Sequence, residues 1–387
     1  MESTAPARGS YRTGRERVER ILDAAHGAFI SGGYRASSLR DIARAAGISH
    51  PGLLRYFSSK AEILTALIER LDAESAARWD LFASEGSGEI TPSMIAKGGQ
   101  EVPGWVELFT ALLGEATSPS HPGHPLMLAR RQEGAALGIA GLARRGVPSA
   151  DAERALRLVV AGWEGLQILA LYFPAEIDIV AHLERREDHL NEGAPVPEPD
   201  AVAPPDPHPA GDPPSASTAA AARLYAQHGY YETSMQAVAD EAGITRAALI
   251  HIAPTKEALL HAVLLELFGA STDGDEILGL VHRPRWVTAA EVVLLCEATV
   301  PSHPAHPFFR ARLAAARSSV AEILVGEGAE APHDDADWIV ASCLGILIAW
   351  LYEPERVDPA EMLAGALAWT RPAADAAHDR RDKPGGR

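Results

Sequence analysis

The stretch that decides the fold is Ser37-Ser38-Leu39-Arg40-Asp41-Ile42-Ala43-Arg44-Ala45-Ala46-Gly47-Ile48-Ser49-His50-Pro51-Gly52-Leu53-Leu54-Arg55-Tyr56-Phe57-Ser58-Ser59-Lys60. Ser37 or Ser38 suits the N-cap of a first helix, because a serine hydroxyl accepts a hydrogen bond from a free backbone N–H. Gly47 stands where a helix end favours positive φ. Ser49 then suits the cap of a second helix, with Pro51 in its first turn, where no N–H is needed. The stretch predicts two short helices around a sharp corner, a helix-turn-helix.

The flanking sequence has the same organisation. Residues 15–31 place apolar side chains on one helical face and end at a pair of glycines, and a longer helix begins near Lys60. The residues that matter most are Ala24-Ala25, Phe29, Gly33-Tyr34, Ser37-Ser38-Leu39, Ile42-Ala43, Ala46-Gly47-Ile48-Ser49, Leu53 and Tyr56-Phe57-Ser58-Ser59-Lys60. In this order and spacing, residues 15–75 resemble the TetR/AcrR family of transcriptional regulators.

The resemblance implies an all-α fold. Each unit would have an N-terminal three-helix head that contains the helix-turn-helix, followed by a C-terminal helical bundle. Members of that family are homodimers that bind a two-fold DNA operator, and a small molecule bound in the bundle releases the DNA. The implied partners are therefore a double-stranded DNA operator and an unidentified small-molecule effector.

The charge of the chain is unevenly distributed. The whole chain carries a net charge of -17, but residues 1–71 contain eleven lysines and arginines against seven acidic residues, a net charge of +4. This segment keeps the cationic character that phosphate binding requires. The N-terminus is polar and has no apolar core of a signal peptide. No apolar run is long enough for a membrane span, so we expect a cytoplasmic protein without a membrane partner.

A second copy of the pattern follows a proline-rich segment. Gly229–Thr245 matches Gly33–Ser49 without a gap, and Lys256 falls on Lys60. Two more segments repeat: Glu115–Pro125 reappears at Glu297–Pro307, and 165–174 at 345–354. A tandem duplication of a whole subunit is the prediction. The expected domains are a basic arm (1–14), a DNA-binding head (15–75), a regulatory helical domain (76–190), a linker (191–217), a degenerate second head (218–270), a second regulatory domain (271–372) and a disordered tail (373–387).

Joining two subunits makes their pairing intramolecular, with an effective concentration that reaches ~mM. The expected interface is formed by 150–172 and 337–352, and a further homodimer of the whole chain stays open. The second head has lost cationic character: residues 215–268 have three basic against five acidic side chains, a net charge of -2. An anionic surface is repelled by a phosphate backbone. We therefore predict weakened or lost DNA binding by this head.

The candidate DNA contacts lie in the first head. Arg55 and His50 can donate to base edges in the major groove, Gly52 permits close backbone approach, and polar side chains position the helix on phosphates. The predicted DNA-binding residues are Ser38, Ser49, His50, Pro51, Gly52, Arg55, Tyr56 and Lys60. Arg8, Arg12 and Arg15 form either an arm that reaches DNA or a disordered basic tail.

Two other groups of residues have competing interpretations. His121 with His124, and His303 with His306, form paired imidazoles; without a carboxylate or cysteine at a supporting spacing they favour a capped helix corner over a metal site. Aromatic residues in the C-terminal helices line either a ligand pocket or an ordinary core. The pocket candidates are Trp105, Phe109, Met127, Trp163, Gln167 and Tyr172 in the first copy, and Trp286, Phe308, Trp338 and Trp350 in the second.

The sequence thus predicts a sequence-specific, ligand-responsive transcriptional repressor that is a single-chain pseudo-dimer. The alternative is a ligand-sensing or protein-interaction module that has lost sequence-specific DNA binding. No nucleophile motif, phosphate-binding glycine loop or metal-ligand spacing is present, and Cys296 and Cys343 form no disulfide framework. We therefore expect neither catalysis nor a cofactor.

Overall fold

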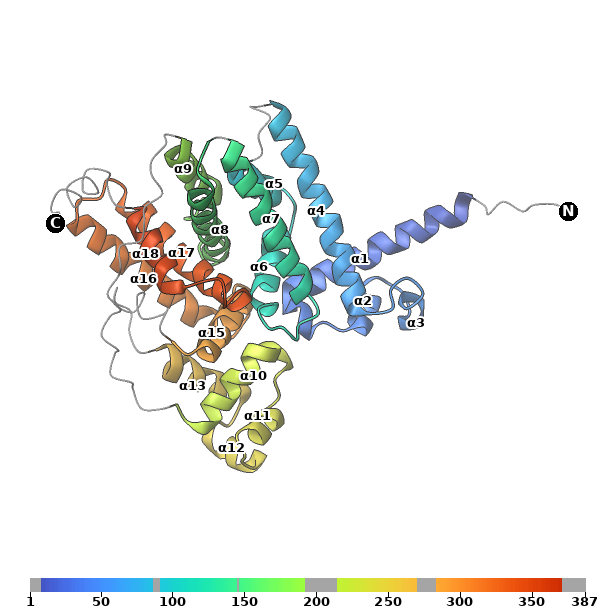
Figure 1. Cartoon of the computed structure of the whole chain (residues 1–387). Coiled ribbons are helices and arrows are strands. Elements are labelled where there is room, and N and C mark those ends of the chain that lie inside the picture. The colour runs from blue at the N-terminus through green and yellow to red at the C-terminus, as the bar shows by residue number, and fades with distance from the viewer. Residues whose placement is uncertain (1–7, 86–90, 145, 192–213, 270–282, 371–387) are drawn as a thin grey trace, which may run out of the picture.

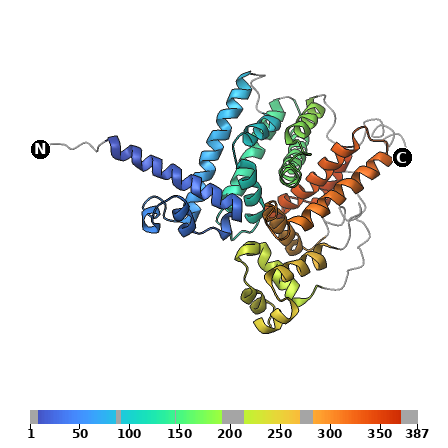
Figure 2. The same ribbon diagram turned by 180° about the vertical axis from the view of Figure 1, so that it is seen from behind.

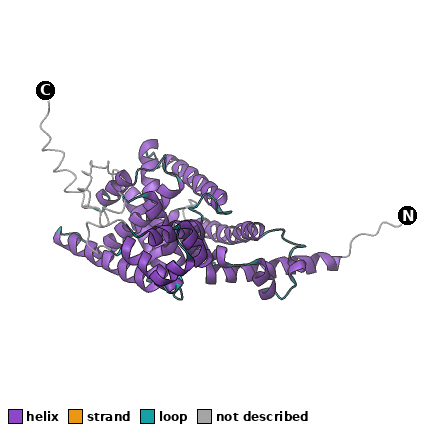
Figure 3. Ribbon diagram, turned by 90° about the horizontal axis from the view of Figure 1, so that it is seen from below, coloured by secondary structure: helices purple, strands orange, loops and turns teal. Residues whose placement is uncertain are grey.

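The computed structural model describes residues 8–85, 91–144, 146–191, 214–269 and 283–370. Within these ranges the chain consists of helices joined by loops, as the all-α prediction requires (Figures 1 and 3). Residues 1–7, most of the predicted linker and the whole predicted tail lie outside them. The duplication divides the described residues into a first half (8–191) and a second half (214–370).

Each half has a head followed by a core. The first head comprises α1 to α3 and the start of α4, and the first core comprises α5 to α9 (Figure 1). Their bounds are α1 Arg8–Ala36, α2 Leu39–Ala45, α3 His50–Leu53, α4 Lys60–Glu85, α5 Pro92–Gln100, α6 Trp105–Glu115, α7 His124–Arg144, α8 Ser149–Tyr172 and α9 Ile179–Asn191.

The second half repeats this order. Its head comprises α10 to α13, and its core comprises α15 to α18, which lie beside the first core on the side away from the first head (Figures 1 and 2). The bounds are α10 Ala216–Glu232, α11 Met235–Glu241, α12 Arg246–Ile252, α13 Lys256–Phe268, α15 Arg285–Glu297, α16 His306–Gly326, α17 Pro332–Tyr352 and α18 Pro359–Ala368.

The helix-turn-helix forms for the reasons that the sequence suggests. Ser38 is the N-cap of α2 and accepts a hydrogen bond from the Asp41 backbone N–H, so it is the cap of the two serines considered. Gly47 has φ +68° at the corner. Ser49 then caps α3, with Pro51 in the first turn. Residues Leu53, Phe57, Ile42 and Phe29 are buried and join the head to its core.

Several predicted boundaries are wrong. The first helix begins at Arg8, so the residues assigned to a basic arm from that position belong to α1. The glycine- and serine-rich composition of residues 83–99 predicts a loop, yet α4 continues to Glu85 and α5 begins at Pro92, capped by Thr91. In the second half, Ser215 caps α10, which removes residues 215–217 from the predicted linker. Side-chain caps and tertiary packing override the glycine and serine content at these places.

The two halves contact each other mainly through α8 and α17. A Cβ atom on Gly165 would lie 1.8 Å from the carbonyl oxygen of Ala341, and one on Gly345 would lie 1.9 Å from that of Ala161. The glycines therefore allow the two backbones to touch. By length and composition α8 and α17 are apolar enough to cross a membrane, but most of their apolar windows, 72% and 94%, are buried inside the protein.

Candidate nucleic-acid interface

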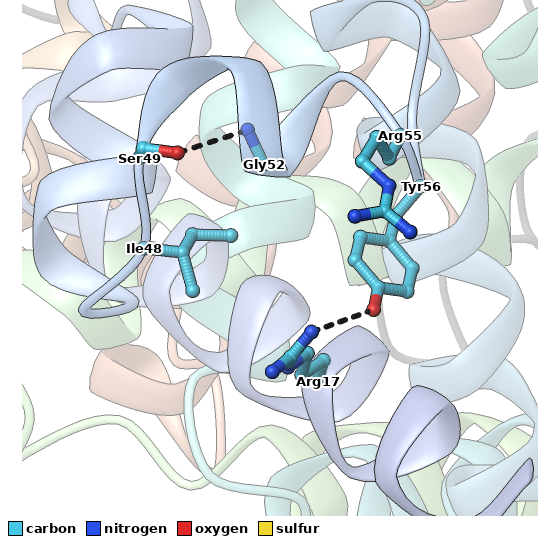
Figure 4. Close-up of a pocket in the computed structure, with 6 residues that line it drawn as sticks. All are labelled: Arg17, Ile48, Ser49, Gly52, Arg55 and Tyr56. Carbon is cyan, nitrogen blue, oxygen red and sulfur yellow. Dashed lines mark hydrogen bonds between the residues drawn. The ribbon is translucent and has the colours of Figure 1, made fainter. Parts of the chain in front are cut away.

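The start of α3 presents polar atoms at the surface of the first head. Ser49 Oγ accepts a hydrogen bond of 3.1 Å from the Gly52 backbone N–H, which fixes the first turn (Figure 4). Pro51 is exposed and His50 is half-buried beside this cap. The cap leaves the exposed edge of α3 free to approach a ligand.

A recess lies between α3 and α1. Its empty volume is about 470 Å³, and its lining residues are Arg17, Ile48, Ser49, Gly52, Arg55 and Tyr56 (Figure 4). Arg17 Nη1 donates to the Tyr56 hydroxyl at 3.4 Å, and Arg55 is exposed at the rim. Two guanidinium groups, a hydroxyl pair and a backbone turn therefore converge on one place, an arrangement suited to an anion such as a phosphate.

Arg17 was not among the predicted contact residues. It lies on α1, 39 residues before Tyr56, and only the packing of α1 against the helix-turn-helix brings it to the recess. The sequence does show a basic α1, but it does not show which arginine faces α3.

Lys60 occupies a different position from the predicted one. Its Nζ atom donates to the backbone oxygens of Tyr34, Arg35 and Ser37 at 2.8, 3.0 and 2.8 Å. The ammonium group also lies 4.4 Å from the centre of the Tyr34 ring. Because an ammonium has three N–H donors, these bonds use all of them. Lys60 therefore stabilises the loop after α1, and the phosphate contact predicted for it does not fit this geometry.

Ser38 is exposed and bonded within its own helix start. Its hydroxyl donates to the Asp41 carboxylate and accepts from the Asp41 N–H. Asp41 also pairs with Arg44 at 2.6 Å. The hydrogen bonds from Ser38 lower the pKa of the exposed Asp41 carboxyl. Ser38 thus acts as a cap, and its predicted DNA contact remains a proposal.

The second head keeps the backbone of this site and loses the two arginines of the recess. Thr245 caps α12 through a 3.1 Å bond from the Ala248 N–H, and Gly243 has φ +68° like Gly47. The repeat places His251 at the position of Arg55 and Ile252 at that of Tyr56. Ile252 is 60% exposed. Pro213, outside the described residues, falls on Arg17.

A buried glutamate joins the first head to its core. Glu115, at the end of α6, accepts hydrogen bonds from the backbone N–H groups of Tyr34 (3.2 Å) and Arg35 (3.3 Å). These N–H groups follow Gly33, whose φ of +83° breaks α1. The Glu115 carboxylate also lies 3.4 Å from Nε2 of the buried His121. The end of α1 is therefore held between Glu115 on one side and Lys60 on the other.

The second half repeats this junction. Glu297 accepts a 2.8 Å hydrogen bond from the Tyr230 N–H, and His303 Nε2 lies 3.8 Å from its carboxylate. Burial, and then the nearby negative charge of Glu115, raises the pKa of Glu297 to about 8. Burial also lowers the pKa of His303 to about 4.

The second histidine of each His-Pro segment contacts the other half. His124 stacks on Tyr352 with ring centres 5.5 Å apart, and His306 stacks on Tyr172 at 5.0 Å. Each tyrosine hydroxyl donates across to a backbone oxygen, Tyr172 to Leu295 at 2.8 Å and Tyr352 to Leu113 at 3.2 Å.

These reciprocal contacts give His124 and His306 a role in the contact between the two halves. Sequence reasoning missed the roles of Glu115 and Glu297. The signal that could have found them is the retention of Glu, His and His in both copies, although the rest of the two halves has diverged.

Among the predicted pocket residues, Trp105 and Phe109 have different neighbours from Tyr172. Trp105 and Phe109 contact each other, with Arg130 stacked 4.4 Å from the Phe109 ring centre. Tyr172 instead contacts the second half. Met127 and Gln167 are buried and Trp163 is half-buried. In the second half, Trp338 is fully buried against Gly162. The assignment of these residues to a ligand pocket stays a prediction.

A family model described as bacterial regulatory proteins of the tetR family matches residues 21–67 and residues 218–263. The chain carries two TetR-family domains in tandem. The chain is also similar to the HTH-type transcriptional activator FasR of Mycolicibacterium smegmatis, with 41% identity over 69 residues. That match covers 17% of this chain and 32% of FasR, so it spans about a third of the relative's length.

The two TetR-type matches confirm the predicted duplication, including the divergent second head. Both cover the helix-turn-helix and its caps, while Arg17 of the recess lies just before the first matched segment. The cores α5–α9 and α15–α18 lie outside the matched residues.

Proposed function

We propose that this chain is a cytoplasmic, sequence-specific DNA-binding transcriptional regulator that binds DNA through its first head. The observation that carries the proposal is the cationic recess at α3, formed by Arg17, Arg55, Ser49 and Tyr56 in a TetR-type domain. Its counterpart in the second head has no arginine and exposes Ile252.

Each residue in the first head has a distinct role in this proposal. Arg55 and His50 contact base edges, while Ser49, Tyr56 and Arg17 contact phosphates. Gly52 allows the DNA backbone to approach α3. The cap itself does not require glycine, because Ala248 makes the same cap in the second head.

The two halves act as a single-chain pseudo-dimer. The reciprocal contacts of His124 with Tyr352 and of His306 with Tyr172 support this arrangement, because equivalent residues exchange partners as in a two-fold interface. With one DNA-competent head, the chain occupies one half-site, and a palindromic operator requires a second copy of the chain.

Regulation follows a two-state scheme in this proposal. A small molecule bound among the core helices would favour an orientation of the first head that no longer fits the major groove. The Glu115 bonds to Tyr34 and Arg35 offer a direct mechanical connection between α6 and that head. We propose repression as the outcome; FasR is named an activator, so a reporter assay should register changes in both directions.

The test is the binding of the full chain to DNA from upstream of its own coding sequence. Fluorescence anisotropy at about 50 mM and about 200 mM salt measures affinity and its salt dependence. Arg55→Ala should lower specific affinity by ~10- to 100-fold, the value of one good base contact. His251→Ala, at the equivalent position, should leave the affinity unchanged, as should Arg246→Ala on α12.

Three outcomes separate the interpretations. Loss with Arg55→Ala alone supports the one-headed regulator. Equal losses in both heads would mean that the second head also reads DNA. Weak, salt-sensitive binding without sequence preference in the wild-type chain would favour the alternative of a sensing or interaction module.

A further inference from the structure

We infer that the face between the two halves is heterotypic: each core fits the unlike core of this chain and excludes a like core. This inference rests on the intramolecular pairing proposed above and is independent of DNA binding. Its basis is a set of positions at which the two halves have diverged in complementary ways, beside a glycine crossing that stayed symmetric.

The symmetric part would accept any combination of cores. Gly165 touches the backbone of Ala341, and Gly345 touches that of Ala161. Gly165 and Gly345 are equivalent positions of the repeat, as are Ala161 and Ala341. The glycine crossing therefore holds two helices together without distinguishing them.

A tryptophan and a glycine break this symmetry. A Cβ atom on Gly162 would lie 2.4 Å from Cη2 of Trp338, so the indole fills the space that the glycine leaves. The equivalent positions are Ser342 for Gly162 and Leu158 for Trp338. In a pair of second cores, each Trp338 would meet the extra atoms of Ser342. In a pair of first cores, the smaller Leu158 would leave part of the space above Gly162 empty.

The crossing of α6 and α15 shows a second complementary pair. Gly114 and Cys296 are equivalent positions of the repeat and face each other. A Cβ atom on Gly114 would lie 2.4 Å from the Cβ of Cys296. Two second cores would place two Cβ atoms in that same contact, while two first cores would leave the volume of the Cys296 side chain unfilled. Only the unlike pair packs without a clash or a void.

A buried ion pair gives the largest difference. Arg186 on α9 donates to Asp335 on α17 at 2.9 Å, and both side chains are less than 8% exposed. The guanidinium also stacks 4.9 Å from the Trp338 ring centre. The repeat places Ala366 at the position of Arg186 and Ala155 at that of Asp335, and both alanines are fully buried.

Like pairs would leave these charges without partners. Two first cores would place each Arg186 against Ala155, and two second cores would place each Asp335 against Ala366. An unpaired buried charge is strongly unfavourable. Selectivity therefore arises from what the wrong pair leaves unsatisfied as much as from the contacts of the right pair.

The experiment uses the whole chain with a protease site inserted between Pro204 and Pro205 of the linker. Labelled (15N) and unlabelled protein are purified, cleaved, mixed, unfolded in urea and refolded by dilution. Native mass spectrometry then counts the three kinds of fragment pair. We expect pairs of unlike fragments in which one fragment is labelled and the other is not. The fraction of like pairs should be at least ~10-fold below one half, which is the fraction that random pairing would give.

Like pairs at the random fraction would overturn the inference but leave the proposed pairing intact. Separate fragments without any pairing, directly after cleavage, would overturn the pairing itself. The uncut chain supplies a second measurement that does not need refolding of fragments. The single variant Asp335→Ala should lower the thermal midpoint more than the double variant Arg186→Ala/Asp335→Ala, because the single change leaves Arg186 unpaired. Equal thermal midpoints for the single variant and the wild-type chain would contradict the role of the ion pair.

Discussion

The two heads have nearly the same backbone, but the residues exposed on their helix-turn-helix surfaces differ in chemistry. Ser234 and Thr245 cap α11 and α12 as Ser38 and Ser49 cap α2 and α3, and the corner glycines share φ +68°. The exposed residues have changed, with arginine and tyrosine replaced by histidine and isoleucine. The comparison shows that caps, a corner glycine and a few buried side chains maintain the helix-turn-helix, while DNA recognition depends on residues that the fold does not need.

The heads also differ in how they are attached. The first nine residues of α10 include a row of buried small side chains, Ser217 to Ala222, and α10 packs closely on α15. Helix α1 instead extends from Arg8 past the head, with exposed arginines at 15, 17 and 20. The start of α10 is packed against the second core, whereas the first half of α1 extends away from the rest of the molecule (Figure 1).

The largest expected difference concerns Lys60 and Lys256. Lys60 donates to three backbone oxygens, while Lys256 donates to one, that of Tyr231, at 2.9 Å. Both lie 4.4 Å from a tyrosine ring centre. Lys60→Met should therefore lower the free energy of unfolding by roughly 2–3 kcal/mol, and Lys256→Met by roughly 1 kcal/mol. Urea unfolding of the full chain measures both.

Both lysines make the same ring contact, so each variant is a control for the other. The difference between the two losses of unfolding free energy therefore reports the hydrogen bonds to backbone oxygens. Equal losses in the two variants would show that the ring contact dominates and that the two junctions are energetically alike. A loss of DNA affinity by Lys60→Met without any change in stability would restore the phosphate contact that the sequence predicted.

The second prediction concerns the pH dependence of stability. The pKa of Glu297 is about 8 in the folded chain, against an ordinary value of 4.5. The folded state therefore keeps a proton that the unfolded state has lost. Between about pH 6.5 and pH 8, stability should therefore fall by up to about 1.4 kcal/mol per pH unit. Below about pH 6.5 the lowered pKa of His303 acts in the opposite direction and offsets this fall.

Glu297→Gln should flatten this dependence, because the amide cannot ionise and its oxygen can still accept the Tyr230 N–H. Thermal unfolding between about pH 5 and pH 8.5 checks this. Glu241→Gln, at an exposed position of α11, serves as the control. A wild-type curve as flat as that of Glu297→Gln would contradict the raised pKa.

The smallest expected effect concerns Arg17. As a phosphate contact on the rim of the recess, it should add about one to the slope of log affinity against log salt concentration. Arg17→Ala should reduce that slope by about one and weaken binding to all sequences alike. Anisotropy titrations over a series of salt concentrations measure it. A change in sequence preference would place Arg17 at a base edge instead, and no change would separate the recess from DNA.

The sequence predicted much of the fold because the relevant signals are local. Ser49, Pro51 and Gly47 specify caps and a corner through their own hydrogen bonds and φ values, and the helix at residues 15–31 follows from apolar spacing. The errors lie where packing overrides composition. Residues 92–100 are rich in small residues, yet they form α5, because Thr91 caps it and it packs against α4 and α9.

The candidate site was predicted in part for the same reason. Arg55 and Tyr56 follow directly from the motif, and their proximity to each other is local. Arg17 could not be assigned, since it reaches Tyr56 only through the packing of α1 across the head. The phosphate contact predicted for Lys60 stays a prediction. The sequence could not show that the ammonium group donates to three backbone oxygens, because these are brought to it by the packing of α4 against the end of α1.

By itself, the sequence determined that this is an all-helical, duplicated chain with one basic head and one acidic head. Composition, helical periodicity and repeat spacing follow from the order of residues along the chain and do not depend on how the chain folds. The tertiary structure alone decided which side chains meet: Glu115 with the end of α1, Arg186 with Asp335, and Gly162 with Trp338. These contacts join residues distant in the chain, and their free energy depends on burial and close packing, which exist only once the two halves have folded together.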